Sequence, residues 1–395
     1  YKLHCFLAVV LLSVKVVFQV SFHPRNPRLL ACGAAENFGL VGSGMGLVYE
    51  LEDTAVAASA SSRAHQAPPS SLSKAHMEDG LVSTTAVPMK VHATFPTPDA
   101  VYDIAWIGNT SDTWSTHSAS RSLLALACGD GSIRLHSRGK SSPSKVCKDA
   151  HTSEVSALER MGDSQLLSGA YGGDCRMYDI ERLNSEDGIR FCGHTDTVHS
   201  ISWDKALPHS FLSGSGDGTI ILWDVRMPSK ENKDGSREVG AGVLALKVRG
   251  GQVLCLDHDP HNMWQIAAGC ADGGFRLFDA RNPKLSHVGK WKQGKFVEGQ
   301  WNIPLHVFTG HDLGVRSIAF SELAPGQLLT GSYDMSIALW DLNNNTEPLV
   351  AHLEHHQEFV HGVAWSPFEK SRIASCSWDE SVATLDIRLK RDLPQ

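Results

Sequence analysis

The sequence has no pair of cysteines at the spacing of a zinc site or a redox motif. Its nine cysteines are scattered without a CxxC pair, and most lie in apolar runs such as "LLALACGDG". Such a distribution favours buried, reduced thiols over a disulfide framework or a metal site. We therefore expect no structural metal and no disulfide scaffold.

Basic charge is also in short supply. The chain carries 36 Lys and Arg against 43 Asp and Glu, a formal net charge of −7. Proteins that bind a nucleic-acid backbone need a surplus of positive charge. We expect no nucleic-acid partner, whereas a cationic partner fits this balance.

Signatures of catalysis are missing as well. There is no GxSxG elbow, no phosphate-binding loop ending in GK[ST] and no HExxH motif. The glycine-rich "VGSGMG" at 41–46 precedes strand-like residues rather than a helix, so it is read as a turn. We expect no cofactor and no enzymatic activity.

The apolar N-terminus, "CFLAVVLLSVKVVFQV", is the stretch that bears on membranes. It resembles the core of a signal peptide, but Lys15 interrupts it and no small-residue cleavage pattern follows. We expect residues 6–22 to form strand packed within the protein, with no direct membrane insertion. A secretory or membrane role is the alternative.

One unit recurs along the chain. Its best-marked copies begin with Gly-His or His-His, contain a tight turn with Asp, and close on Trp-Asp or a related pair, at 193–226, 310–342 and 355–387. Four weaker copies lie at 16–51, 100–137, 151–180 and 252–281. The length of each copy with its loops is about that of the four-stranded WD repeat, a unit that cannot bury both faces alone. The sequence predicts an all-β, seven-bladed WD-repeat β-propeller.

Three insertions separate or interrupt the copies. Residues 52–98 are rich in Ala, Ser and Pro and are predicted to be a disordered loop. Residues 107–121 interrupt the second blade, and the loop insertion 282–309 links the fifth and sixth blades. We expect the segment from Phe6 to Val14 to supply the outermost strand of the last blade.

The stretch "EHHQEFVHGVAW", residues 354–365, raises the question of a metal site, because His355, His356, Glu358 and His361 are close in sequence. The repeats favour a structural role, in which the blade-entry His and the turn Asp bond with a Ser or Thr and the strand Trp. The residues expected to order the blades are His194, Asp217, Trp223, His311, Asp334, Trp340, His356 and Asp379. A metal site remains the alternative.

Several segments carry a more specific resemblance. They are "NFGLVG" at 37–42, "DAVYDIAW" at 99–106, "EHHQEF" at 354–359 and "SWDE" at 377–380. On these motifs the chain resembles the receptors for the type 2 peroxisomal targeting signal, the peroxin-7 family, over all seven blades.

The resemblance implies a non-enzymatic import receptor. It would bind cargo proteins whose N-terminal signal is an amphipathic helix with basic and His/Gln positions. It would act with a peroxisomal import co-receptor and with docking proteins at the peroxisomal membrane. It would cycle between the cytoplasm and the peroxisome.

Charge supports a binding face on the ring. The loops that lead into the innermost strands offer carboxylates that suit a basic helix, and aromatic residues precede the tight turns. The candidate peptide-binding residues are Asp99, Asp103, Glu154, Asp196, Asp312, Glu358, Tyr171, Tyr333 and Trp378. We expect replacement of Asp103 or Glu154 by Lys to weaken binding while the fold survives.

Two other functions remain open at this stage. One is a WD-repeat scaffold or adaptor of another multiprotein complex, such as a ubiquitin-ligase adaptor or a chromatin reader. The other is a propeller enzyme, for example a methylesterase of the diphthamide pathway.

Overall fold

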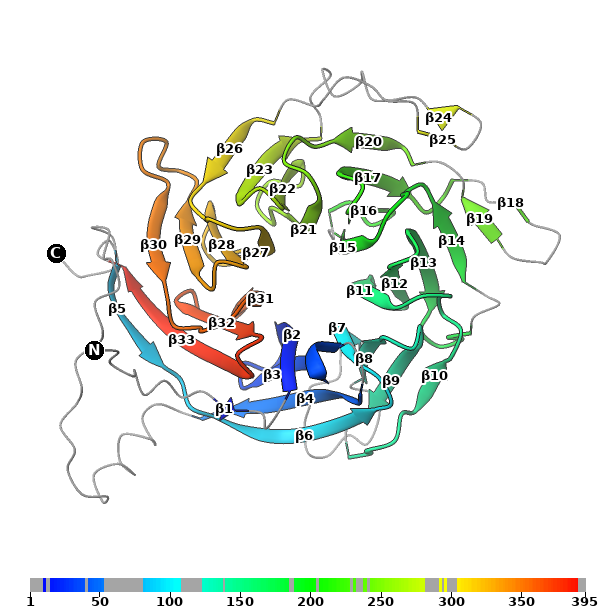
Figure 1. Ribbon diagram of the computed structural model, residues 1–395, viewed down its shortest axis with the longest axis horizontal. Helices are drawn as coiled ribbons and strands as arrows, with labels where there is room; N and C mark the ends of the chain where they lie inside the picture. The colour runs from blue at the N-terminus through cyan, green and yellow to red at the C-terminus, as the bar shows by residue number, and fades with distance from the viewer. Residues whose placement is uncertain are drawn as a thin grey trace.

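The computed structural model describes residues 10–11, 15–39, 42–52, 81–107, 123–137, 139–184, 188–203, 206–227, 230–231, 237–239, 242–280, 291–292, 295–296 and 304–389. Regular structure in these ranges is β-strand apart from one 3-10 helix, η1 (Asn37–Gly39). Seven sheets stand radially around a central axis (Figure 1). The predicted all-β, seven-bladed WD-repeat β-propeller is thereby confirmed. None of these ranges contains a helix long and apolar enough to cross a lipid bilayer.

The first four blades follow one another in chain order. Blade 1 contains β2 (Lys15–Phe22), β3 (Leu29–Glu36), β4 (Gly44–Leu51) and β6 (Met89–Thr97). Blade 2 contains β7 (Val101–Ile107), β8 (Leu123–Cys128), β9 (Ile133–Ser137) and β10 (Lys145–Cys147). Blade 3 contains β11 (Val155–Met161), β12 (Gln165–Ala170), β13 (Asp174–Asp179) and β14 (Ile189–Cys192), extended by β19 (Arg237–Val239) and β18 (Lys230–Glu231). Blade 4 contains β15 (Val198–Trp203), β16 (Ser210–Ser215), β17 (Thr219–Asp224) and β20 (Leu244–Lys247).

The remaining three blades complete the ring. Blade 5 contains β21 (Val253–His258), β22 (Gln265–Cys270), β23 (Gly274–Asp279) and β26 (His306–Thr309). Blade 6 contains β27 (Val315–Phe320), β28 (Gln327–Ser332), β29 (Ile337–Asp341) and β30 (Leu349–Leu353). Blade 7 contains β31 (Val360–Trp365), β32 (Arg372–Ser377) and β33 (Ser381–Leu389), with β1 (Val10–Leu11) and β5 (Leu81–Ala86) on its outer side. A separate pair joins β24 (Trp291–Lys292) to β25 (Lys295–Phe296).

Blade 7 is closed differently from the prediction. Of the predicted closing segment 6–14, residues Val10 and Leu11 pair with Val382 and Ser381, and the others lie outside the described residues. The rest of the outer edge is β5, which pairs with β33 from Leu385 to Leu389. The closing strand is therefore shared between two segments.

The insertion 52–98 is also corrected. Residues 81–97 form β5 and β6, so the prediction of disorder over the whole range is wrong there, and residues 53–80 lie outside the described ranges. The alternation in "LVSTTA" and "MKVHATF" is a strand signal that the neighbouring Ala, Ser and Pro obscured. The predicted insertion 282–309 likewise includes β26, the outer strand of blade 5.

The chain passes directly from blade 7 to blade 1 between β5 and β6, as Figure 1 shows along one side of the ring. The backbone N–H of Val87 donates to the carbonyl of Thr384 at 2.9 Å, and the Thr384 hydroxyl donates to the carbonyl of Val87 at 2.7 Å. Val87 is fully buried in a core that joins both blades. This connection is named the bridging segment, residues 81–97.

In blades 1, 3, 4, 5 and 6 the second strand packs against the next blade through a glycine. A Cβ on Gly214 would lie 2.8 Å from Cγ1 of Val253, and one on Gly331 would lie 2.8 Å from Cγ1 of Val360. Because no real Cβ tolerates such an approach, the small residue lets the inner-strand valine of the next blade seat against the sheet. The repeated Ser-Gly or Thr-Gly pairs thus set the distance between blades.

Candidate functional site

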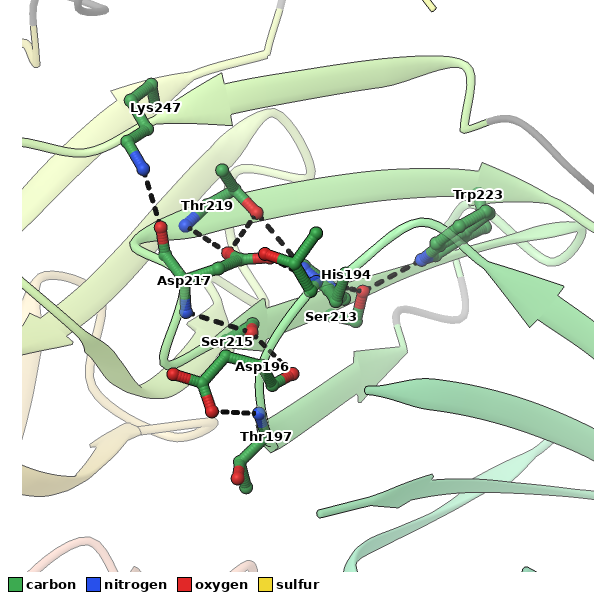
Figure 2. A network of polar contacts seen from close by, with 10 residues as sticks. His194, Asp196, Thr197, Ser213, Ser215, Asp217, Thr219, Trp223 and Lys247 are labelled. Atoms are coloured by element: carbon green, nitrogen blue, oxygen red, sulfur yellow. Dashed lines mark hydrogen bonds and ion pairs between the residues drawn. The ribbon is translucent and has the colours of Figure 1, made fainter. Parts of the chain in front are cut away.

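Blades 4, 6 and 7 are each ordered by a polar network at one end of their strands. In blade 4, Nδ1 of His194 lies 3.1 Å from Oδ2 of Asp217, and its Nε2 lies 2.7 Å from Oγ of Ser213. The indole N–H of Trp223 donates to the same Ser213 oxygen at 2.8 Å (Figure 2). The loop before the inner strand is thereby fixed to the turn between the second and third strands. We call the face of the ring that carries these loops and turns the turn face.

The network recurs in blades 6 and 7. His311 pairs with Asp334 at 2.8 Å and with Thr330 at 2.7 Å, and the indole of Trp340 donates to Thr330 at 2.8 Å. His356 pairs with Asp379 at 2.9 Å. Its Nε2 bonds Ser375 at 2.9 Å. The structural geometry proposed for the eight blade-ordering residues is thus present in the described contacts.

The turn aspartates carry depressed pKa values. Burial opposes ionisation, but the hydrogen bond and charge of His194 lower the pKa of Asp217 to about 2, and His356 with Ser381 does the same for Asp379. In blade 3 the turn has Gly172 and Gly173, and Asp174 at the start of the third strand pairs with His151 at 3.3 Å instead. The repeat alignment did not reveal this substitution.

The histidine cluster of blade 7 does not converge on one point. His355 and His356 both bond Ser375, while His361 lies in the inner strand and stacks on Trp378 with ring centroids 4.9 Å apart. In the described part of the chain, no group of three or more His, Cys, Asp or Glu side chains is placed to hold a metal ion.

Five of the six candidate carboxylates lie on the turn face. Glu154, Asp196, Asp312 and Glu358 are exposed in the loops before their inner strands, and Asp99 is half-buried in the corresponding loop of blade 2. The fields of Glu154 and Asp99 reach Tyr102, whose pKa is raised by burial first and by these charges and Tyr171 in addition. These five residues, the acidic rim, therefore surround the mouth of the central channel.

Asp103 is placed differently from the other acids. It is buried, with 9% of its surface exposed, and its Oδ2 accepts the backbone N–H of Leu158 in blade 3 at 2.7 Å. Its Oδ1 accepts the N–H of Ile104 at 2.7 Å. The carboxylate therefore links two blades, and the expectation that the fold survives its replacement by Lys is incompatible with these contacts.

The three candidate aromatics belong to a larger group. Trp378 contacts Phe18 at 5.9 Å and Phe359 at 5.4 Å between ring centroids, and Phe359 contacts Tyr333 at 5.1 Å. On the other side Tyr171 lies 5.9 Å from the ring of Tyr102, which in turn lies 5.0 Å from Phe18. We call this group the aromatic arc; its members are Phe18, Tyr102, Tyr171, Tyr333, Phe359, His361 and Trp378.

Four arc members were missed by sequence reasoning, although a signal was available. In every inner strand one buried valine is followed by a residue at the same register. Six of these residues line the axial cavity and are called the mouth residues: Phe18, Tyr102, Ser156, His199, Arg316 and His361. The seventh, Leu254, is buried outside that lining. Aligning the repeats on that valine would have identified Phe18, Tyr102 and His361, whereas Phe359 precedes the valine of blade 7.

A cavity of about 310 Å³ lies along the axis of the ring. The mouth residues Phe18, Tyr102, His199, Arg316 and His361 line it, and Asp103, Glu159 and Asp257 line it as well. Arg316 is the single Lys or Arg in this lining. The cavity thus combines one permanent cation with four acidic side chains. Three come from the inner strands of blades 2, 3 and 5, and the fourth, Glu322, follows the inner strand of blade 6.

Comparison with known proteins agrees with this architecture. A family model for the WD domain, G-beta repeat, matches residues 187–224, 244–279, 302–341 and 347–383. Together with the seven radial sheets, these matches make the chain a WD-repeat β-propeller.

Several relatives are similar to the chain over nearly its whole length, and they belong to one kind of WD-repeat protein. The peroxisomal targeting signal 2 receptor of Mus musculus is 24% identical over 93% of this chain and 93% of its own length. The receptors of the same name from Schizosaccharomyces pombe and Dictyostelium discoideum are 22% and 25% identical, over 92% and 89% of this chain. The resemblance to this receptor family, predicted from the motifs, is confirmed.

Proposed function

We propose that this chain is an import receptor for peroxisomal cargo, and that it binds the type 2 targeting signal of those proteins on the turn face. The observation that carries the proposal is the full-length similarity to receptors of that name. The turn face supplies a site with suitable chemistry, in the acidic rim and the aromatic arc.

The signal expected from the family resemblance is an amphipathic helix with basic positions. Its cations would lie against the acidic rim, where Glu154 and Asp196 are exposed beside the mouth. Its apolar side would lie on the aromatic arc, where Tyr171 is 44% exposed. Opposite charge directs the encounter and the register, while aromatic contact area supplies most of the binding energy.

A helix lying on a ring is covered on one side by the propeller alone. A second protein, the co-receptor, would cover the other side, and docking proteins at the peroxisomal membrane would then receive the complex. In this scheme the receptor performs no chemistry and cycles between cytoplasm and peroxisome.

A WD-repeat scaffold of another assembly is the second candidate. Other proteins match the chain over smaller shares of its length, from 35% to 76%. A match confined to part of a propeller carries the repeat pattern rather than a shared site. The import receptor therefore has the stronger support.

The test is binding of a synthetic type 2 signal peptide, followed by fluorescence anisotropy with and without co-receptor. One control peptide has the same composition in an order that destroys the amphipathic face, and another has Glu in place of each Lys and Arg. We expect saturable binding of the signal alone. Equal binding of the scrambled peptide, or no binding even with co-receptor present, would exclude the proposal.

A further inference from the structure

The mouth of the central channel holds polar groups that the propeller itself leaves without partners. Both ring nitrogens of His361 lack a hydrogen-bond partner among the described residues, although only 6% of the residue is exposed. Its ring is held by stacking on Trp378 and by an edge contact with Phe18 at 5.2 Å. A buried imidazole with unused nitrogens is costly unless something binds it.

Arg316 lies near His361, and most of its hydrogen-bond donors also have no described acceptor. Its one described hydrogen bond runs from Nη1 to the carbonyl of Leu254 at 3.3 Å, and it forms no ion pair within the described ranges. A guanidinium has five N–H donors. Most of its donating capacity therefore remains available in the cavity.

The guanidinium is also central. Its charge acts on His199 in blade 4, Tyr171 in blade 3 and His361 in blade 7. Burial first, and Arg316 second, lower the pKa of His199 to about 4 and hold that of His361 well below its ordinary value. Both imidazoles are therefore neutral at pH 7, and each can donate one N–H.

We infer that the channel mouth is a binding site for a single carboxylate, presented as an Asp or Glu side chain by the polypeptide that covers the turn face. Arg316 supplies the charge, and His361 and His199 supply neutral donors on either side. The assignment of that polypeptide to a bound signal or its co-receptor rests on the proposed function. The carboxylate site itself does not.

The order of the charged residues along the channel determines whether its mouth binds an anion or a cation. A basic side chain entering the channel would meet Arg316 before it reached Asp103, Glu159 or Asp257, whereas an acidic one stops at the mouth with a cation and two donors. Asp103 lies within the field of Arg316, but both of its oxygens are bonded to backbone N–H groups. The turn face thus has a negative rim and a positive centre.

The test uses the full chain and two small probes, N-acetyl-glutamate amide and N-acetyl-glutamine amide, which differ in charge but hardly in shape. Histidine ring signals are followed by NMR in protein labelled at the imidazoles, with His361 assigned through His361→Phe. We expect the glutamate probe to shift the His361 signal saturably and the glutamine probe to bind at least tenfold more weakly.

Variants separate the site from general electrostatics. Arg316→Met should weaken the glutamate probe at least tenfold, and Arg316→Lys should keep the preference for glutamate with reduced affinity, because Lys retains charge without the planar fork. Lys148→Met removes one exposed charge from the same face and should change nothing. Thermal unfolding checks that each variant is folded.

The inference is overturned if the two probes bind wild type equally, if no saturable shift occurs, or if folded Arg316→Met binds like wild type. Should Arg316→Met not fold, the comparison of probes on wild type and on Arg316→Lys still decides. Because this assay contains no signal peptide, loss of peptide binding with retained probe binding would refute the proposed function alone. The reverse result would refute the carboxylate site alone.

Discussion

Asp103 accepts the backbone N–H of Leu158 at 2.7 Å across the boundary between blades 2 and 3. Ser200 accepts the N–H of Leu256 at 3.1 Å and Ser317 accepts that of Val363 at 3.0 Å, between blades 4 and 5 and blades 6 and 7. The same position of the inner strand therefore joins blades, with a hydroxyl in some and a carboxylate in one.

Replacing Asp103 by Lys should unfold or strongly destabilise the protein. The change leaves the N–H of Leu158 without an acceptor and buries a cation, which together cost about 3–5 kcal/mol by analogy with broken buried pairs. Asp103→Ser copies blades 4 and 6 and should be the milder change. Denaturant unfolding of both variants checks this; equal stability of Asp103→Lys and wild type would contradict it.

Glu154→Lys should weaken binding of the signal peptide while the fold stays intact, because Glu154 is exposed on the acidic rim. We expect roughly a tenfold loss, about 1.4 kcal/mol, mostly in the association rate and shrinking at high salt. The matched control is Glu181→Lys, an exposed acid of the same blade in the loop that leaves its third strand on the opposite face. Stopped-flow association at two salt concentrations measures the effect. A loss of equal size in the control would remove the rim from the site.

Tyr171→Ala should weaken peptide binding with little effect on stability, because nearly half of this ring is exposed at one end of the aromatic arc. Loss of a central aromatic anchor costs about 2 kcal/mol. Trp378→Ala should lower both affinity and stability, since its ring also packs on Phe359 and His361. Calorimetric titration and thermal unfolding of the two variants separate these effects. Unchanged affinity in both would place the apolar contact away from the arc.

His356→Ala should act through folding alone. Removal of the imidazole deletes its buried hydrogen bonds to Asp379 and Ser375, at a cost of about 1–3 kcal/mol, although His355 still bonds Ser375. Peptide affinity per folded molecule should equal that of wild type. His209→Ala, at an exposed position, serves as the control. A specific loss of affinity in folded His356→Ala would instead assign this histidine to the binding site.

Stability should depend on pH in a direction set by the central channel. Burial first, and then the charges of Asp103 and Asp257, raise the pKa of Glu159 to about 8, and burial raises that of Asp257 to about 7. These values exceed those of the unfolded chain, about 4. Their contribution to stability is therefore full below about pH 4 and is lost as the pH rises through 7 to 8.

The turn aspartates make stability depend on pH in the opposite direction. The pKa values of Asp217 and Asp379, at about 2, lie below those of the unfolded chain, so their contribution is present above about pH 4 and is lost as the pH falls through 2. The melting temperature should therefore be highest in mildly acidic buffer and fall towards pH 8.5. Glu159→Gln should reduce that fall. A melting temperature that rises from pH 5.5 to 8.5 would contradict the assignment.

The repeat pattern was sufficient to predict the ring because the repeated residues contact one another within a single blade. The pairs His194 with Asp217 and Ser213 with Trp223 are close in sequence, so alignment of copies revealed them. Contacts between blades leave no such local mark. The link from Asp103 to Leu158 and the pairing of β5 with β33 join distant segments. The expected survival of the fold in Asp103→Lys and the predicted disorder of residues 81–97 were therefore wrong.

The binding face was only partly predictable for the same reason. Loop acids such as Glu154 and turn aromatics such as Tyr171 could be placed because loops and turns alternate between the two faces. The inner-strand residues Arg316 and His361 come together only when the ring closes, so their combination cannot be read from any single repeat.

The bridging segment sets the order in which this molecule can assemble. Val87 and Thr384 are 297 positions apart, and their hydrogen bonds complete the last blade. The partner of β5 is β33, which follows every other described strand, so β5 has no strand partner until the chain beyond blade 6 is available. Contacts of such long range slow folding and leave strand edges open meanwhile. Ring closure, rather than the formation of any single blade, should therefore limit the folding rate, and shielding of β5 by a chaperone would protect the newly made chain from aggregation.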